Sequence, residues 1–582
     1  QKWLDIKFKR FKRFFFITHI NMVKRTLYII LIMLLGLGSY TQEVYEHVSN
    51  NNIYNFLDEM ANEKLIELNS LIKPYSRKMI YEKLEEVNGK LHDDDTKLSK
   101  RQINELNFYL RSYTLESDSK NLSITKNKLS LTKNNNLAFA ANPPGLFYKD
   151  SLFTLALQPI LGGSYSSNSN GNLTHTWGGA SMFGYIAENV AFYASVRDNN
   201  VSRLMISPEY FVHTRGVPVK NFGDEGVDYA DARGGLMFSW KWGSVGIVKD
   251  HIEWGLGYNG TNIQSGHSPS FAQIKLELKP VRWFEFNYYH GWLVSEVVDS
   301  ARSYWTNNTY RVVYHDKYMA ANMFTFYPFK YLNFSFGNSI IYSDMGGNGP
   351  HLAYLIPFLF YKAVDITLSG YEKYGYASNN NQFFFNISSR NIKHLHLYFS
   401  LFADDISVKY FFDKDLYNSF SYKLGFRLSN FIIKNVTLTT EYTRTNPYVY
   451  QHHAATQDYT SNSYNMGNYL RDNSQELFLS LRFNPIRGLN IKASYSIAQH
   501  GDDYDINDPD ANVHSDPILN NIVWEKQNFG VDASYEVVSN TYLFMNFNYQ
   551  NITGEQVYIE MFTPEYYWGS TSTFTLGMNM GF

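Results

Sequence analysis

The chain has 582 residues and contains no cysteine. This absence excludes disulfide bonds, thiol catalysis, cysteine-ligated zinc and a lipid anchor carried by an N-terminal cysteine. Charge is also scarce, because charged residues make up 18% of the chain and 52 Lys and Arg nearly balance 54 Asp and Glu. The sequence therefore has no basic footprint for nucleic acid. None of these absences excludes export from the cytoplasm.

Long hydrophobic runs are missing from nearly the whole chain. Near the start, Lys24 and Arg25 precede an apolar core over residues 27–37, which small residues follow. This core is shorter than the roughly 20 residues that a spanning helix needs. We therefore predict a signal peptide over residues 22–41 and a non-native extension over residues 1–21. Since nothing later could form a membrane helix, the mature protein is either soluble in the periplasm or spans a membrane as a barrel.

Aromatic residues are abundant, at 17% of the chain, with 47 Tyr and 43 Phe. A large membrane barrel needs aromatic girdles at both interfaces and a polar lumen. Such a barrel has a low mean hydropathy, here -0.34, without long apolar runs. An aromatic-rich soluble β protein is the alternative that fits the same composition.

Alternating apolar and polar residues dominate residues 143–582, as in 274–278. A period of two places successive side chains on opposite faces of a strand. Charged residues on the inward face, such as Lys275, Glu277 and Arg482, suit a hydrated lumen and would be costly against lipid. At ~10 residues per spanning strand, these roughly 440 residues predict an all-β transmembrane barrel of about 16 to 18 antiparallel strands.

The connections between the expected strands are of two kinds. Long polar connections, such as 445–472 and 499–516, are expected at one end of the barrel. Short connections at the other end share a proline two residues before a basic residue, because proline suits a tight turn. Short turns at one end and long loops at the other are typical of outer-membrane barrels. The proline–basic pairs are Pro280 and Arg282, Pro328 and Lys330, and Pro485 and Arg487.

The final residues form the clearest strand in the sequence. Apolar residues alternate there with Thr, Gly and Asn, so one face of the strand requires hydrocarbon. An apolar edge would promote aggregation, whereas a barrel closes the last strand against the first and leaves no edge. The pattern resembles the C-terminal signal by which the barrel-assembly machinery recognises bacterial outer-membrane barrels. The residues of this predicted insertion signal are Phe574, Leu576, Met578, Met580 and Phe582.

The segment before the strands has a helical period. Apolar residues recur three and four positions apart over residues 43–114, which predicts a small bundle of three helices. Pro74 separates the first two helices, and Ser99 with Gln102 forms a capping-box start for the third. The Asn- and Ser-rich residues 115–142 are expected to link this periplasmic bundle to the barrel.

Several motifs raise the question of catalysis or metal binding. Residues 255–260 match the dinucleotide fingerprint, but a strand is predicted to follow where that site requires a helix. The acidic run 502–510 lacks the glycine and closing glutamate of a calcium loop. We therefore predict no cofactor and no metal, and a protein that is not an enzyme. An outer-membrane enzyme using His267 or Ser268 remains a third functional hypothesis.

Two segments carry a family resemblance. Residues 54–77 resemble the N-terminal segment of the capsule-assembly Wzi-like proteins, especially those of the Bacteroidetes type. Residues 253–258 are similar to the Trp-Gly-Pro-Gly segment of that family, although this chain has Leu256 in place of the proline and His267–Ser268 in place of Asn-Ala.

The resemblance implies a protein of the bacterial outer membrane that attaches capsular polysaccharide or exopolysaccharide to the cell surface without a covalent bond. Sugar rings would stack on aromatic faces, and polar side chains would bind hydroxyl and acidic groups. The implied glycan-binding candidates are Trp254, Tyr258 and Asn262. The alternative for Trp254 is a structural aromatic at the membrane interface. The alternative function is a diffusion or transport channel. The expected partners are outer-membrane lipid and the barrel-assembly machinery, and no nucleic-acid partner is expected.

Overall fold

The computed structural model describes residues 43–92, 98–116, 128–130, 136–223, 226–346, 349–369 and 379–581. The predicted extension and signal peptide lie outside these residues, as does Phe582 of the predicted insertion signal.

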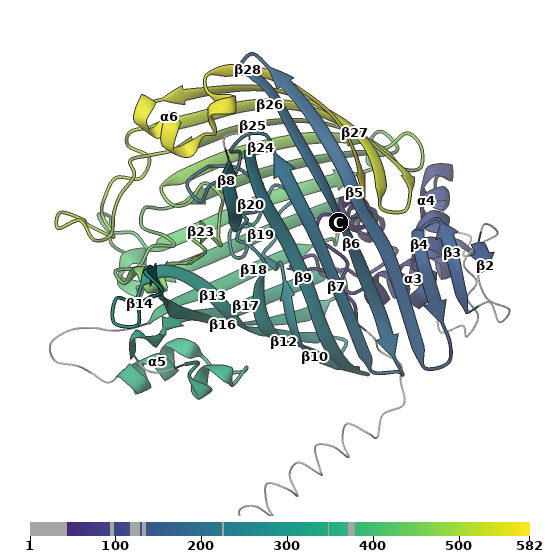
Figure 1. Cartoon of the computed structure of the whole chain (residues 1–582), viewed down its shortest axis with the longest axis horizontal. Helices are drawn as coiled ribbons and strands as arrows, with labels where there is room; N and C mark the ends of the chain where they lie inside the picture. The colour runs from purple at the N-terminus through teal and green to yellow at the C-terminus, as the bar shows by residue number, and fades with distance from the viewer. Residues whose placement is uncertain are drawn as a thin grey trace, which may run out of the picture.

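The described residues form a closed antiparallel barrel of 18 strands, which confirms the predicted fold class (Figure 1). Each strand of the ring pairs with the next, and the last pairs with the first, so the ring itself is closed, as a membrane-spanning sheet requires. The ring runs β5 (Phe153–Asn168), β6 (Gly171–Ile186), β7 (Val190–Val201), β9 (Gly226–Trp240), β10 (Gly243–Asp250), β12 (Phe271–Val281), β13 (Phe284–Val298), β16 (Tyr314–Phe329), β17 (Leu332–Ser343), β18 (Asn380–Ser389), β19 (Leu395–Asp405), β20 (Ser419–Ser429), β21 (Val436–Thr445), β24 (Ser474–Phe483), β25 (Leu489–His500), β26 (Trp524–Val538), β27 (Thr541–Gly554) and β28 (Ser570–Met580).

The remaining elements lie at the two ends of the barrel, inside it or on its outer wall. They are α2 (Asn51–Asn62), β1 (Ile72–Lys73), α3 (Arg77–Gly89), η1 (Lys90–His92), α4 (Lys100–Ser112), η2 (Thr114–Glu116), β2 (Lys128–Ser130), β3 (Leu137–Ala141), β4 (Pro144–Lys149), β8 (Val219–Gly223), β11 (Glu253–Trp254), β14 (Tyr304–Thr306), β15 (Thr309–Arg311), η3 (Asp344–Gly346), η4 (Leu352–Leu355), α5 (Tyr361–Ser369), η5 (Val408–Phe411), η6 (Ala455–Gln457), β22 (Thr460–Ser461), β23 (Tyr464–Asn465), α6 (Gln556–Phe562) and η7 (Glu565–Tyr567). Strands β2 and β3 fall in the range expected as a linker and extend the sheet from β4 and β5.

The last strand closes the barrel as its alternation predicts. β28 pairs with β27 on one side and with β5 on the other. Its residues Phe574, Leu576 and Met578 all point outward and are exposed, while Thr571 and Thr573, which precede them, are buried on the inner face. The apolar face of the final strand is therefore part of the outer wall.

The outer wall is apolar and the inner wall is polar. Leu236, Ile247 and Ile274 lie side by side across β9, β10 and β12, and Ile247 is 68% exposed. The predicted inward positions Lys275 and Glu277 face the lumen and pair with each other, with 2.6 Å between Nζ and Oε1. An exposed apolar belt around a closed barrel requires a hydrocarbon environment, so this is a barrel of the bacterial outer membrane. Within the described ranges, no helix has the length and hydrophobicity to cross a membrane.

The helices α2, α3 and α4 form a bundle at the end of the barrel that has the short turns. In outer-membrane barrels this end faces the periplasm. The capping box predicted at Ser99 and Gln102 begins α4. The bundle contacts the turns directly: the Asn62 amide donates to Ser429 Oγ at 3.0 Å, and Tyr331 Oη donates to the Lys64 carbonyl at 3.0 Å. The bundle therefore covers the short-turn mouth.

Part of the outer wall of the barrel is covered by the segment around α5, which packs against it from outside (Figure 1). Asn322 occupies an outward position on β16 and is fully buried. Its amide donates to the carbonyls of Pro357 and Leu359, each at 2.9 Å. The segment around α5 thus satisfies a polar side chain that would otherwise face hydrocarbon.

Candidate functional site

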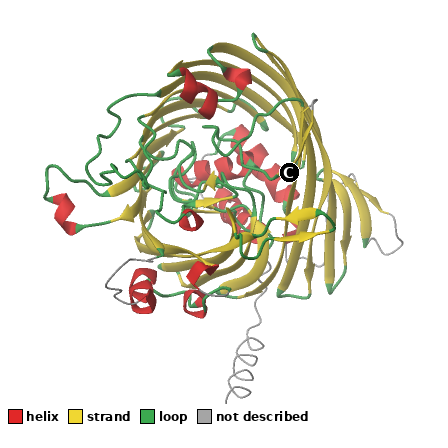
Figure 2. Cartoon of the chain, turned by 60° about the vertical axis from the view of Figure 1, so that its left-hand side comes forward, coloured by secondary structure: helices red, strands yellow, loops and turns green. Residues whose placement is uncertain are grey.

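The barrel lumen is crossed by two segments that meet inside it. β1, which belongs to the N-terminal segment, pairs with β11 in the connection between β10 and β12. In this pairing Ile72 lies opposite Trp254, and the Gly255 N–H donates to the Leu71 carbonyl at 2.9 Å. Figure 2 shows helices and loops inside the ring of strands. The interior is therefore a packed plug built from both ends.

The connection between β21 and β24 adds to the plug from the long-loop end. The Ser265 N–H donates to the Met466 carbonyl at 2.8 Å, and Tyr450 Oη donates to the Asn262 carbonyl at 2.7 Å. Aromatic rings fill the space between these loops and the wall, with Phe402 4.7 Å from Tyr450 between ring centroids. This packing anchors the inward loops to the barrel.

The structure places two predicted glycan-binding residues in this packed interior instead of on a surface loop. Trp254 is 2% exposed, and its ring packs edge-on against Tyr289 with 5.0 Å between centroids. Asn262 is fully buried, where it donates to the Ser421 carbonyl at 2.8 Å and accepts from Ser400 Oγ at 2.8 Å. Their connection folds into the lumen, so both side chains hold the plug in place. Trp254 is also not an aromatic of the membrane interface.

Tyr258, the third predicted residue, lines a cavity of about 580 Å³ between the plug and the wall. This volume falls within the range of small-molecule sites. Six basic and three acidic side chains line the cavity, together with amides and tyrosines. The charged lining residues are Lys73, Arg197, Arg215, Lys423, Arg482, Lys492, Asp58, Asp231 and Glu253.

Most of the basic side chains have a carboxylate partner. Lys423 Nζ lies 3.1 Å from Glu441 Oε2, and both residues are buried in the wall. Lys492 Nζ lies 2.9 Å from Asp532 Oδ2 on the neighbouring strand. These pairs cancel their own charges and leave little attraction for a ligand.

Two arginines of the same wall are different. Arg427 on β20 and Arg482 on β24 flank β21, where they lie opposite the neighbouring inward residues Thr439 and Thr437. In the part of the chain that the structure describes, no carboxylate oxygen lies within 4.0 Å of either guanidinium group. Arg427 donates to Asn55 Oδ1 at 3.0 Å, but its Nε is buried without an acceptor.

Tyr258 is held beside these arginines by three contacts. Its N–H donates to Glu441 Oε1 at 2.6 Å, and its hydroxyl lies 2.9 Å from His396 Nδ1. The Arg427 guanidinium covers one face of the ring, 4.2 Å from its centroid. That face is unavailable to a sugar ring, so Tyr258 would act mainly by positioning Arg427.

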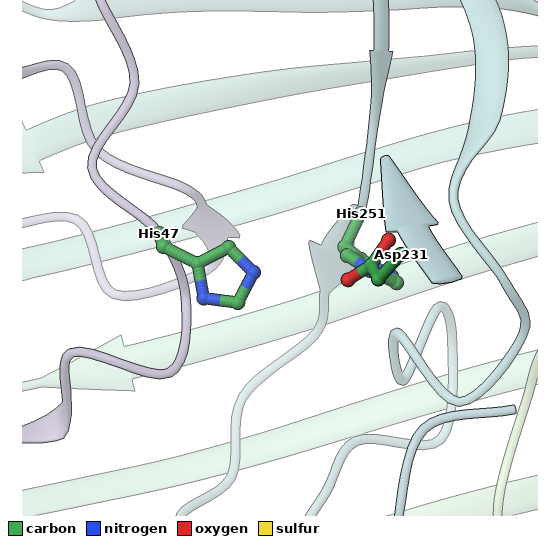
Figure 3. A group of neighbouring side chains, drawn as sticks. All are labelled: His47, Asp231 and His251. Atoms are coloured by element: carbon green, nitrogen blue, oxygen red, sulfur yellow. The ribbon is translucent and has the colours of Figure 1, made fainter. Parts of the chain in front are cut away.

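A group of possible metal ligands includes two residues that line the cavity, His47 and Asp231 (Figure 3). Ligand atoms of His47, Asp231 and His251 lie within 4.8 Å of one another, and His251 Nε2 is 3.2 Å from Asp231 Oδ2. The Ser49 N–H donates to His47 Nδ1 at 3.2 Å, which places the proton of the neutral ring on Nε2. A metal could use that nitrogen only after the proton moved.

The charge around this group also opposes a cation. Burial, together with the guanidinium groups of Arg233 and Arg215, lowers the pKa of His47 well below its ordinary value. The same positive field would repel a divalent ion. His251 and Asp231 are therefore best described as a hydrogen-bonded pair, and the geometry does not favour a metal centre.

The residues that suggested catalysis serve the plug. Gly255 and Gly260 adopt φ values of 118° and 77° in the inward loop, and β12 follows where a dinucleotide site would need a helix. His267 and Ser268 are both buried, and the Gly216 N–H donates to the His267 carbonyl at 2.6 Å.

Sequence reasoning named Arg482 as an inward residue but did not select Arg427. Arg427 has the same signal, because it lies on the inward face of an alternating strand. Its lack of a carboxylate partner could not be read from that pattern, since the neighbouring strands decide it.

The fold of this chain is similar to that of solved outer-membrane barrels. No family model and no curated protein matches the sequence. Wzi from Escherichia coli, an outer-membrane protein involved in group 1 capsule assembly and a carbohydrate-binding β-barrel, matches with a TM-score of 0.53 at 12% identity, covering 93% of this chain and 100% of that one. OccD3 from Pseudomonas aeruginosa matches with a TM-score of 0.39 at 12% identity, covering 73% and 90%. OccAB1 from Acinetobacter baumannii has a TM-score of 0.40 at 10% identity, covering 73% and 96%. The chain shares the barrel fold of Wzi along nearly its whole length.

Proposed function

We propose that this outer-membrane barrel binds capsular polysaccharide or exopolysaccharide and holds it at the cell surface without a covalent bond. The observation that carries the proposal is the plug, in which β1 pairs with β11 across the lumen. A diffusion channel needs a continuous water-filled lumen. A barrel filled from both ends, with a polar cavity left between plug and wall, suits a protein that binds its ligand and does not conduct it.

The fold similarity to Wzi supports the same proposal, since that protein is a carbohydrate-binding barrel. The polar cavity supplies the donors and acceptors that sugar recognition needs, and Tyr258 is the predicted glycan residue that lines it. Trp254 and Asn262 would act indirectly, because they fix the loop that carries Tyr258.

The surroundings follow from the outer wall. The exposed apolar belt would contact outer-membrane lipid. We also propose that the alternating C-terminal residues, Phe574 to Met580 with Phe582, are read by the barrel-assembly machinery during insertion.

The test is a comparison of surface-bound and released polysaccharide in cells with and without the gene. Loss of the surface layer, with total polymer constant and the released fraction increased, is the expected result. An unchanged layer in the deletion strain would reject attachment as the function.

A planar-bilayer recording separates attachment from transport. The purified protein should show no large steady conductance steps, because the plug occupies the lumen. Steady steps of a size typical of open porins would favour the channel, which is the second candidate function.

A further inference from the structure

Among the described residues, Arg427 and Arg482 form a pair of positive charges with no carboxylate inside ion-pair distance. The two guanidinium groups come from strands on either side of β21, and both border a small space beside Asn55. Arg482 has no hydrogen-bond acceptor among the described residues, and it lines the 580 Å³ cavity as well. Arg482 lines both spaces, so the two arginines lie where the small space meets the cavity.

Such an arrangement is costly unless something else supplies the negative charge. Arg427 is 3% exposed, whereas Arg482 is half-buried. A buried charge without a partner costs on the order of several kcal/mol. Elsewhere in the same wall, Lys423 and Lys492 each have a carboxylate within ion-pair distance. Glu59 and Glu105 also line the small space, but both bind Arg101. An anion from outside the chain could therefore pair with the two arginines.

We propose that Arg427 and Arg482 bind the carboxylate group of an acidic glycan whose chain occupies the lumen cavity. This inference rests on the proposed function and specifies its ligand class. A guanidinium group matches a carboxylate with two parallel N–H donors, so two arginines on one side of a cavity can bind it from two directions. The contact of Arg427 with Tyr258 and Asn55 holds its fork in position before the ligand arrives.

The cavity selects a sugar over a small inorganic anion. Its volume far exceeds that of a phosphate or chloride ion, and its other walls carry uncharged groups that bond hydroxyls, including Asn259, Asn468 and Tyr469. An arginine anchor beside groups that bond hydroxyls is suited to a uronic acid within a glycan chain.

The experiment measures binding of tetragalacturonic acid to the purified full-length protein in detergent micelles by isothermal titration calorimetry. The matched probe is the same oligosaccharide with its carboxyl groups methyl-esterified, which removes the negative charges and adds one methyl group to each carboxyl. We expect the acid to bind and the ester to bind at least about 10-fold more weakly, as the loss of a charge-assisted hydrogen bond implies. Equal affinities would overturn the proposal.

Substitutions of the two arginines test where the carboxylate of the glycan binds. Arg427→Gln and Arg482→Gln should each weaken acid binding about 10-fold or more, whereas Arg482→Lys should retain part of it. Arg282→Gln, on an exposed short turn, is the control and should bind as the wild type does. Folding is verified by the heat-dependent shift in gel mobility. If a Gln variant fails to fold, the acid–ester comparison and Arg482→Lys still decide the outcome.

Two further results distinguish this inference from the proposed function. Binding of inorganic phosphate to the wild type, with no binding of either oligosaccharide, would mean a small-anion site only and would overturn the inference. In cells that make an acidic polymer, the Arg427→Gln/Arg482→Gln double variant should lose the surface layer. If the deletion strain loses that layer and the double variant keeps it, attachment stands and the arginine site is rejected.

Discussion

The arginines that hold the helical bundle and the arginines of the cavity wall are used in opposite ways. Arg390, in the turn after β18, is 3% exposed and donates to Asp58 Oδ1 at 2.6 Å, to Asn62 Oδ1 at 2.9 Å and to the Leu68 carbonyl at 3.1 Å. It joins the barrel to the bundle with nearly every donor occupied. Arg427 and Arg482 have no carboxylate partner among the residues that the structure describes.

Two arginines of the helical bundle are likewise paired with carboxylates. Arg77 lies between Glu46 and Glu116, at 2.7 and 2.9 Å. Arg101 on α4 binds both Glu59 and Glu105. A guanidinium group saturated by its own chain fixes one element against another. An unsaturated one in the same low-dielectric interior is available to a ligand.

The largest effect in this comparison is expected from Arg390→Met. The substitution leaves Asp58 buried without its partner, and breaking a buried pair in this way costs about 3–5 kcal/mol. The free energy of unfolding in detergent micelles should fall by that amount, and the bilayer conductance should rise as the bundle loosens. Arg282→Met is the control on an exposed turn. A change below about 1 kcal/mol would show that Arg390 does not dock the bundle.

A smaller, pH-dependent effect is expected at Glu105, which shares Arg101 with Glu59. Burial raises the pKa of Glu105 from 4.5 to about 7, against the lowering effect of Arg101. The folded protein therefore binds more protons than the unfolded chain in this window. Its stability should fall as the pH rises from 4.5 to about 7 and then level off.

Glu105→Gln tests this dependence because the amide cannot titrate. Unfolding free energies measured at about pH 5 and about pH 7.5 should differ less in the variant than in the wild type, by about 1–3 kcal/mol. Glu86→Gln, on the exposed face of α3, provides the control. Identical pH slopes in wild type and Glu105→Gln would contradict the assignment.

The smallest effect on stability is expected from the cavity arginines themselves. The Arg427→Gln/Arg482→Gln double variant removes two charges that have no carboxylate within ion-pair distance among the described residues, so the unfolding free energy should change by less than about 1 kcal/mol or rise. Arg233→Gln is the comparison variant and should lower the unfolding free energy, because it leaves Asp250 without the guanidinium that binds it at 2.8 and 2.9 Å. Equal losses in the two experiments would remove the distinction between saturated and unsaturated arginines.

Much of the barrel could be predicted because its signals are local. The period of two along each strand, the alternation that ends in Met578 and Met580, and the capping box at Ser99 all depend on residues close in sequence. Inward Lys275 and Arg482 followed from the same period. These features hold whatever the rest of the chain does, which is why the strand count fell within the predicted range.

The candidate site could not be predicted in the same way. Trp254, Tyr258 and Asn262 lie close together in the sequence, and no local pattern shows which of them is buried. The fold buries Trp254 and Asn262 and leaves Tyr258 on the cavity. Whether an inward arginine is neutralised depends on strands far from it in the chain, because register decides which side chains meet.

The sequence by itself determined a closed, aromatic-rich barrel with a helical segment before it, since patterning and period act over a few residues. The tertiary structure alone decided that the barrel is plugged. Ile72 meets Trp254, and Asn55 meets Arg427, only when segments separated by hundreds of residues are brought together. Those distant contacts, and the two guanidinium groups that have no carboxylate partner among the described residues, have no counterpart in any local pattern.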